Sequence, residues 1–322
     1  MSQYDEEILN SNAISPLDEA GQPIPVTIPV ALVPGITVVY TTRLGGISTG
    51  ATGNCNLGGK AGDPAHTLAN REALSRQIGA PISLVRQVHS GQAIDIDKPG
   101  YAPNASFGYD ASATGTPIEA DGQVTARPGI ALGMFAADCL PVLMADPIAG
   151  VIGAAHCGRR GLERGVIGAT VDLMVAKGAD PGHIVATLGP RICGDCYEVG
   201  DQIADEFDAR FPGTFTLSRF GKPGIDIAHA ALEALAEAGV PMDSLVESRP
   251  RVNAATQYLD SDEELRQLCA TDGEGDPDLT VRIDAIRRSM CTLENPLWYS
   301  HRRAALAGKT QEGRMLALIV RS

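Results

Sequence analysis

Short apolar segments separated by turn residues recur along the sequence and predict buried strands. Seven segments have this pattern: residues 36–41, 84–89, 130–135, 142–145, 151–155, 184–188 and 315–320. The turn residues at 146–150 predict a β-hairpin centred near Ile148. Such a hairpin places Cys139 opposite His156 or Cys157.

Apolar residues at helical spacing, bounded by capping residues, predict helices at residues 63–79, 162–176, 201–211 and 226–238. The first begins with Asp63 as its N-cap and stops at Gly79. Arg71 lies three residues from both Leu68 and Leu74, on the apolar face of this helix. Its guanidinium is therefore predicted to point inward, where it must pair with a carboxylate, reach water or line a pocket.

Strands and helices follow one another without strict alternation, which predicts one α+β domain with two packed mixed β-sheets and outer helices. Five prolines suppress helix over residues 1–34 and predict an extended N-terminal arm before a domain at 35–322. Residues 260–280 hold eight acidic residues against one basic residue. We interpret this stretch as an exposed insertion, part short helix and part loop, with no chemistry of its own.

The chain of 322 residues has 26 Lys+Arg against 39 Asp+Glu, a formal charge of −13, and is 44% apolar, which is typical of globular proteins. The negative charge repels nucleic acid and anionic membranes, so neither is an expected partner, and an anionic substrate requires a few local cations. We recognise no export signal and no membrane-spanning stretch, so the expected location is the cytoplasm. Nothing in the sequence indicates an oligomeric state.

Histidine and cysteine residues at strand ends form a candidate metal site. A zinc ion with an open position requires about three protein ligands. His89 and His156 each end a predicted strand and Cys139 begins another, and the hairpin alone brings Cys139 beside His156. His89 has no such support from spacing, and the alternative is that Cys139 is a core residue.

Glycines after His156 are a candidate anion site. Backbone N–H groups at Gly158 can cradle an anion at a helix start, and Arg160 can supply a guanidinium to phosphate. The alternative is that the glycines only permit a turn and the arginines are solvated.

Seven cysteines at irregular spacing indicate reduced thiols rather than a disulfide framework. Cys193 and Cys196 have the CxxC spacing of redox and zinc-ribbon sites, but no second CxxC is present, so we interpret the pair as structural. His301 is a reserve candidate for a metal or substrate contact. P-loop and GxGxxG motifs do not occur in the sequence.

Nine short motifs occur in a recognisable order: RLGG at 43–46, NR at 70–71, QVH at 87–89, ADCLPVL at 137–143, HCGRRG at 156–161, LGP at 188–190, CYEV at 196–199, CT at 291–292 and YSHRR at 299–303. Together they resemble the YfiH-like family over roughly residues 36–320. Its members have been called multicopper polyphenol oxidases, peptidoglycan editing factors and purine nucleoside phosphorylases with adenosine deaminase activity.

The resemblance implies a YfiH-like fold, similar to that of cytotoxic necrotizing factor, and zinc bound by His89, Cys139 and His156. Copper is the alternative metal. Asp138 stands beside one of these ligands and is expected either to orient an imidazole or to carry a proton.

The implied activity is phosphorolysis of purine nucleosides, with nucleoside and phosphate as partners, and hydrolytic deamination of adenosine. Arg43 and Arg71 are then expected to bind substrate, Arg71 and Arg160 to hold phosphate, and Asp138 and Arg71 to be catalytic. Two other activities stay open. One is a cysteine hydrolase that edits peptidoglycan precursors with Cys139 as nucleophile; the other is copper-dependent oxidation of phenols, for which six histidines are few.

This chain departs from the family pattern near the metal ligands. Where the family usually has His-Ala-Gly-Trp-Arg-Gly, Cys157 replaces Ala and Arg159 replaces Trp, and His301 replaces Tyr or Phe. Loss of the Trp removes a flat wall for a purine, and Arg159 is expected to stack there or to alter substrate choice. Cys157 is expected to add a second thiol near the metal.

Overall fold

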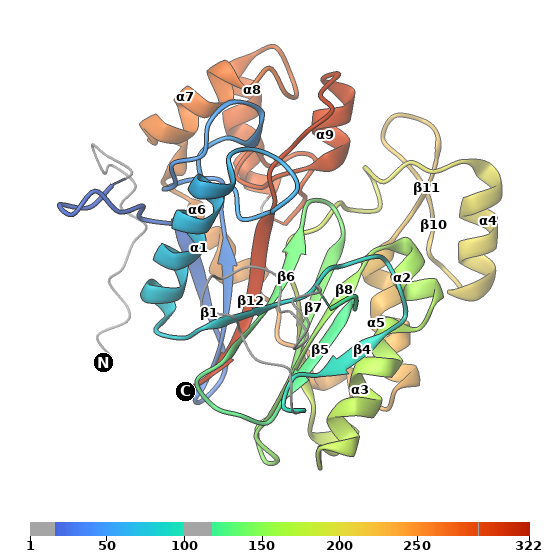
Figure 1. Ribbon diagram of the computed structural model, residues 1–322. Helices are drawn as coiled ribbons and strands as arrows, with labels where there is room; N and C mark the ends of the chain where they lie inside the picture. Colours follow the sequence, from blue (N-terminus) through green and yellow to red (C-terminus); the bar gives the residue numbers. More distant parts are fainter. Residues whose placement is uncertain (1–16, 99–117, 289) are drawn as a thin grey trace.

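The computed structural model describes residues 17–98, 118–288 and 290–322, and two five-stranded sheets form its centre (Figure 1). The first sheet consists, in spatial order, of β1 (Thr27–Val33), β2 (Ile36–Thr41), β12 (Met315–Arg321), β6 (Ala131–Ala136) and β3 (Ile82–Leu84). The second consists of β4 (Ala93–Asp95), β5 (Gly122–Thr125), β8 (Val151–Cys157), β7 (Leu140–Asp146) and β9 (Val185–Leu188). Both sheets are mixed, because β3 pairs in parallel with β6 and β4 with β5.

The remaining elements surround these sheets. The helices are α1 (Pro64–Ile78), α2 (Arg159–Glu163), α3 (Val166–Ala176), α4 (Asp201–Arg210), α5 (Ile227–Glu237), α6 (Arg249–Thr256), α7 (Glu263–Thr271), α8 (Leu279–Asp284) and α9 (His301–Leu306). A small hairpin consists of β10 (Phe215–Leu217) and β11 (Pro223–Ile225). Within the described residues, we find no helix with the length and apolar character needed to cross a membrane.

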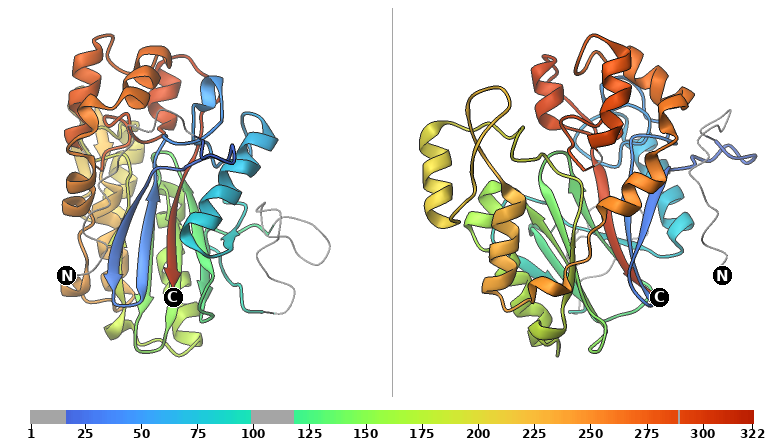
Figure 2. Two further views of the ribbon diagram at one scale, coloured as in Figure 1. Left: turned by 90° about the vertical axis from the view of Figure 1, so that its left-hand side faces the viewer. Right: turned by 180° about the vertical axis from the view of Figure 1, so that it is seen from behind.

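The two sheets pack face to face, and helices cover their outer faces (Figure 2). Val38 and Leu132 of the first sheet and Leu143 of the second belong to the core between them. Leu74 of α1 packs on the opposite face of the first sheet, while α3 and α5 pack on the second. This arrangement confirms the predicted α+β fold of two packed mixed sheets with outer helices.

The capping residues of α1 act as predicted. The Asp63 side chain accepts a hydrogen bond from the Ala65 N–H at 2.8 Å, and Gly79 ends the helix in the left-handed region with φ of 67°. Arg71 is buried on the inward face of this helix, as its spacing indicated. Glycine has no steric penalty at the positive φ of Gly79, which explains why α1 ends at this residue.

The predicted hairpin forms between β7 and β8, but its register is wrong by one residue. Leu140, rather than Cys139, lies opposite Cys157, and Pro141 lies opposite His156. The carboxylate of Asp146 accepts the N–H groups of two turn residues, and the turn is centred half a residue beyond Ile148. Cys139 therefore stands just before the paired part of the hairpin, still next to His156.

Three predicted boundaries are also wrong. Residues 27–33 of the predicted arm form β1, which tolerates Pro29 because it is an edge strand; residues 1–16 lie outside the described part of the chain. The strand predicted at 84–89 ends at Leu84, so His89 lies in a loop. The helix predicted at 162–176 is divided into α2 and α3, because Gly165 adopts a left-handed conformation.

The acidic stretch at 260–280 is not a solvated insertion. Its α7 buries Leu265 and Leu268 in the structure. Glu264 accepts the N–H of Gly45 at 2.9 Å, and Asp272 accepts a hydrogen bond from the Arg43 guanidinium at 3.1 Å. These acidic residues were read as exposed because their partners lie more than 200 positions away along the chain.

Candidate metal centre

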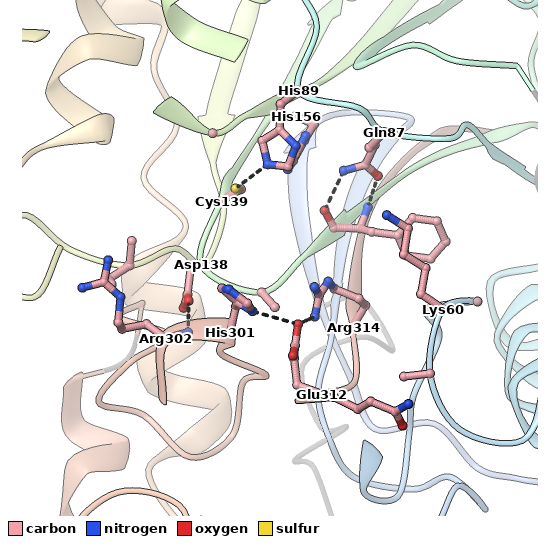
Figure 3. Close-up of a pocket in the computed structure, with 18 of the residues that line it drawn as sticks. Lys60, Gln87, His89, Asp138, Cys139, His156, His301, Arg302, Glu312 and Arg314 are labelled. Carbon is pink, nitrogen blue, oxygen red and sulfur yellow. Dashed lines mark hydrogen bonds and ion pairs between the residues drawn. The ribbon is translucent and has the colours of Figure 1, made fainter. Parts of the chain in front are cut away.

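His89, Cys139 and His156 converge at one end of the two-sheet core (Figure 3). One ligand atom from each residue lies within 4.8 Å of the others, and Cys139 Sγ is 3.6 Å from His89 Nε2. The two imidazole rings meet edge to face with centroids 4.8 Å apart. Two imidazoles and a thiol at this separation fit the donor set of a divalent transition metal.

The buried carboxylate of Asp121, just before β5, holds this group together. It accepts a hydrogen bond from His156 Nδ1 at 2.8 Å and others from the N–H groups of His89 and Ser90 at 3.0 and 2.6 Å. His89 needs such support because its backbone lies in the left-handed region, with φ of 57°. Asp121 therefore orients the imidazole, a role that the sequence had left open for Asp138.

Asp121 was missed because its partners, His156 in β8 and the loop residues His89 and Ser90, lie about 30 positions away along the chain. The only local signal was a charged residue between Ala120 and Gly122, where a strand begins. Burial would raise its pKa, but the hydrogen bonds from His156 and Ser90 lower the pKa to about 2, so the carboxylate stays ionised.

Cys139 and His156 form a polarised pair. Burial would raise the pKa of the thiol, but the charge of His156 and hydrogen bonds from both imidazoles lower it to about 6. Burial would lower the pKa of His156, but the thiolate of Cys139 and the carboxylate of Asp121 raise it to about 9. Without a metal, the pair is therefore a thiolate beside an imidazolium near neutral pH.

The three residues line a cavity of about 560 Å³. Phe135 and Tyr197 contribute aromatic rings to its wall. Its basic side chains are Lys60, Arg86, Arg302 and Arg314. Arg86 pairs with Glu119 and Arg314 with Glu312, whereas the described residues offer Lys60 no ion-pair partner. The cavity thus combines a candidate metal site, flat apolar surface and cations.

Asp138 lies in the wall of this cavity with a fixed carboxylate. One oxygen accepts a hydrogen bond from Thr292 Oγ1 at 2.7 Å and the other from the Arg302 N–H at 2.6 Å. Its backbone is also left-handed, with φ of 90°. His301, the reserve candidate, lines the same cavity and pairs with Glu312.

The predicted arginines are not at the cavity surface. Arg43 is buried elsewhere, with its guanidinium bonded to Asp272 and the Pro296 carbonyl. Arg71 donates to the Leu57 carbonyl at 2.8 Å and lies over the ring of Phe135, behind the lining. Arg160 is exposed on α2 and does not line the cavity.

Gly158 does line the cavity, for a steric reason. A Cβ at this position would lie 2.7 Å from Cys139 Sγ and 3.0 Å from a carbon of the His89 ring. Any side chain here would displace two of the three candidate ligands. The glycine is thus required by close packing beside the metal ligands.

Two of the three departures from the family pattern lie outside the cavity lining. Arg159 bonds to Glu163 on the same helix and does not line the cavity, so it does not replace the missing Trp. Cys157 is fully buried in the core between β8 and the helices, where burial raises the pKa of its thiol. His301 is the one departure that lies at the cavity.

A family model described as multi-copper polyphenol oxidoreductase laccase matches residues 37–258. The chain belongs to this laccase-like, YfiH family. The family assignment made from the nine motifs is thereby confirmed. The solved YfiH protein of Bacillus licheniformis has a TM-score of 0.67 at 24% identity, covering 89% of this chain and 93% of that one. Protein NMB0706 of Neisseria meningitidis gives 0.64 at 27% identity, covering 92% and 99%.

Relatives in the YfiH family have names that indicate chemistry on nucleosides. Purine nucleoside phosphorylase ORF3 of Streptomyces griseus is 44% identical over 203 residues, 61% of this chain and 78% of that protein. The purine nucleoside phosphorylase of Deinococcus radiodurans is 38% identical over 218 residues, 66% of this chain and 80% of that protein. Adenosine deaminase RL5, from an unknown prokaryotic organism, is 33% identical over 231 residues, 67% and 84%.

Proposed function

We propose that this protein is a metal-dependent purine nucleoside phosphorylase that also deaminates adenosine. The observation that carries the proposal is the cavity in which His89, Cys139 and His156 meet aromatic and cationic side chains. The names of relatives at 33% to 44% identity support a substrate of this class.

The donor set fits zinc better than a multicopper centre. Asp121 occupies Nδ1 of His156, which leaves Nε2 of that ring available to a metal. Three protein donors facing a cavity are typical of a catalytic zinc site with an open position. When bound, such an ion supplies Lewis-acid activation of an oxygen on water or phosphate. A multicopper oxidase would need more imidazole ligands than the two in this cluster.

The cavity's own residues can bind both substrates. Lys60 and Arg302 are positioned to attract phosphate against the net charge of −13, and Phe135 and Tyr197 offer surfaces for a purine. Arg71 supports Phe135 from behind, so its effect on the base would be indirect.

Asp138 is the residue we assign to proton transfer. Phosphorolysis breaks the bond between ribose and base, and the departing base takes up a proton; deamination moves protons from water to the leaving ammonia. The two hydrogen bonds to Asp138 fix its carboxylate at the cavity wall, and the remaining lone pairs of Oδ1 and Oδ2 can accept and return a proton.

One observation favours a second function. The thiolate and imidazolium of Cys139 and His156 also make up the pair that a cysteine hydrolase uses to attack a carbonyl. In that function Cys139 acts as the nucleophile and a metal would block it. The two functions therefore predict opposite responses to a chelator.

The test is to purify the protein with its metal and incubate it with adenosine or inosine, with and without phosphate. We expect phosphate-dependent release of base and ribose 1-phosphate, release of ammonia from adenosine, and loss of all three products with a chelator. No product under any condition would refute the proposal. Activity toward a peptidoglycan precursor that survives the chelator and disappears on alkylation of Cys139 would favour the hydrolase.

A further inference from the structure

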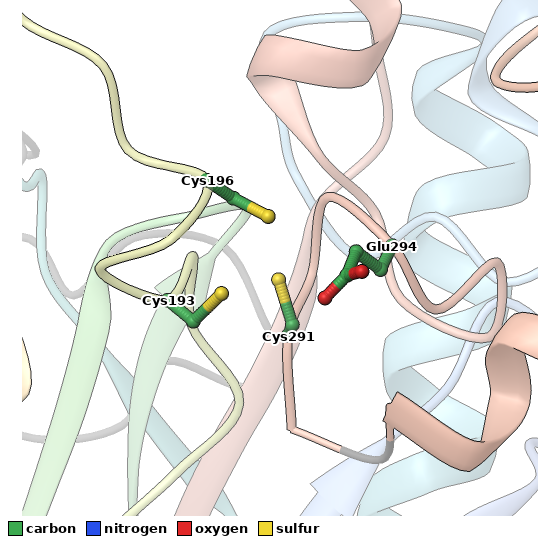
Figure 4. A group of neighbouring side chains, drawn as sticks. All are labelled: Cys193, Cys196, Cys291 and Glu294. Carbon is green, nitrogen blue, oxygen red and sulfur yellow. The ribbon is translucent and has the colours of Figure 1, made fainter. Parts of the chain in front are cut away.

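Three cysteines and a carboxylate gather in a second cluster, separate from the cavity (Figure 4). One ligand atom from each of Cys193, Cys196, Cys291 and Glu294 lies within 4.8 Å of the others. Cys196 and Cys291 are buried, the other two are half-buried, and none lines the cavity described above. The cluster joins the CxxC pair to residues almost 100 positions further along the chain.

Two tight turns of the same spacing present these side chains. In the first, the carbonyl of Cys193 accepts the N–H groups of Cys196 and Tyr197 at 2.9 and 3.0 Å. In the second, the carbonyl of Cys291 accepts the N–H of Asn295 at 2.9 Å. Glu294 lies three residues after Cys291, as Cys196 does after Cys193. The second half of a zinc-ribbon pattern, absent as a CxxC, is present as a CxxE.

Backbone hydrogen bonds hold the two turns against each other. The Arg191 N–H donates to the Met290 carbonyl and the Thr292 N–H donates to the Arg191 carbonyl, both at 2.9 Å. The two half-sites are thus aligned by the backbone before any ion binds. A preformed site of this kind loses little conformational entropy when a metal enters.

The surrounding charges suit a site of net negative charge. Three thiolates and a carboxylate around a divalent ion total −2. Arg219 forms an ion pair with Glu294, and Arg288 Nε lies 3.6 Å from the same carboxylate. Arg191 also contributes positive charge to the thiols from one side. These guanidinium groups offset the excess negative charge of the filled site.

We propose that Cys193, Cys196, Cys291 and Glu294 bind a structural zinc ion, so that the protein holds a second metal besides the one in the cavity. Four protein donors leave no open position, as in structural rather than catalytic sites. Binding releases the thiol protons to solvent and needs no oxidant, whereas a disulfide within the cluster would need one.

The second site has a consequence for Asp138. Ile192, next to Cys193, donates its N–H to the Asp138 carbonyl at 2.9 Å, and Thr292, next to Cys291, donates to the Asp138 carboxylate. The ion would therefore join the two segments that position this residue. This inference does not depend on the nucleoside activity.

The test counts metal in the intact protein and in variants. We expect two equivalents of zinc in the wild type, one in Cys139→Ser, which retains the cluster, and one in Cys291→Ser, which retains the cavity site. Cys269→Ala, a buried cysteine outside both groups, serves as control and keeps two. Replacement of zinc by cobalt in Cys139→Ser should give the charge-transfer absorption of thiolate coordination.

The cobalt spectrum keeps the proposal testable if Cys291→Ser does not fold. Folded Cys139→Ser that carries no metal and shows no thiolate absorption with added cobalt would overturn the proposal. A disulfide between any two of these cysteines in freshly purified protein would also overturn it, as would rapid alkylation of all three thiols before chelator is added.

Discussion

The two cysteine-containing clusters use similar donors in opposite surroundings. The first has three donors, with the partly exposed His89 at the edge of a cavity of about 560 Å³. The second has four donors between two turns and takes no part in that cavity. The number of donors and the access to each cluster, rather than the residue types, are the reasons we propose chemistry for the first cluster and stabilisation for the second.

The substitution His89→Ala should have the largest effect on activity, and it should affect the cavity site but not the second cluster. It removes a donor of the cavity site, so we expect the rates of nucleoside cleavage and deamination to fall by at least about a hundredfold. This loss is larger than that usually caused by replacing a residue that only hydrogen-bonds to a metal ligand. The melting temperature of the metal-free protein should change little, because the His89 side chain contributes little to the core. Steady-state kinetics and thermal unfolding measure the two effects.

Exposed His229, which pairs with Glu233 on α5, supplies the matched control for this experiment. His229→Ala should retain full activity and the same metal content. A His89→Ala protein with unchanged activity would show that the cavity site is not where the reaction occurs.

Substitution Asp121→Asn tests the support of the same site. An amide nitrogen would face N–H donors that now bond to a carboxylate oxygen, so both imidazoles would lose their alignment. We expect metal affinity at the cavity site to fall about 10- to 100-fold. Competition with a chromophoric chelator measures it.

Asp97 provides the control because it accepts hydrogen bonds near the other end of β5. Asp97→Asn should lower stability without changing metal affinity. Equal metal affinities for Asp121→Asn and the wild type would show that Asp121 does not support the metal site.

The metal-free protein should show a pH dependence set by the thiol of Cys139. Because His156 lowers the pKa of Cys139 to about 6, alkylation of Cys139 should rise as pH increases through about 6, rather than through the ordinary value for a thiol. At pH 7 a much larger fraction of Cys139 than of an ordinary cysteine is thiolate, but a less basic thiolate is a weaker nucleophile. We therefore expect Cys139 to be alkylated roughly fourfold faster than an ordinary cysteine.

Peptide mapping after timed iodoacetamide treatment follows this reaction. Substitution His156→Ala should return the midpoint toward that of an ordinary thiol. A midpoint that is the same in both proteins would contradict the thiolate–imidazolium pair.

Lys60→Ala should have the smallest effect, and it tests whether the cavity binds phosphate through this side chain. Lys60 is exposed, so solvent screens its charge, and we expect a KM for phosphate about two- to threefold higher with kcat unchanged. Lys222→Ala, just before β11 and outside the cavity lining, should leave KM unchanged. A lower kcat with unchanged KM would place Lys60 in another role.

The sequence predicted those parts of the protein that depend on near neighbours. The caps of α1, the inward Arg71 and the approach of Cys139 to His156 all follow from residues close together along the chain. His89 was proposed as a ligand from its place at the end of a predicted strand and then from the resemblance, because no spacing rule connects it to the hairpin.

Long-range partners account for what could not be predicted. The family resemblance placed Arg43 at the substrate, and no local pattern indicated that its ion-pair partner is Asp272, 229 positions away. No second CxxC follows the first in the sequence, because Cys291 joins the pair only in the folded chain. Ionised and thiol groups carry little sequence signal of which distant group satisfies them, although burial makes such partners necessary.

The order of strands in the first sheet has a consequence for biosynthesis. β12, the last strand in this chain, lies between β2 and β6, which are made much earlier. During translation β2 and β6 emerge from the ribosome without their shared neighbour, and the loop carrying Glu312 and Arg314 arrives with β12. A nascent chain can therefore complete neither the sheet nor the cavity until residues 312–321 have left the exit tunnel.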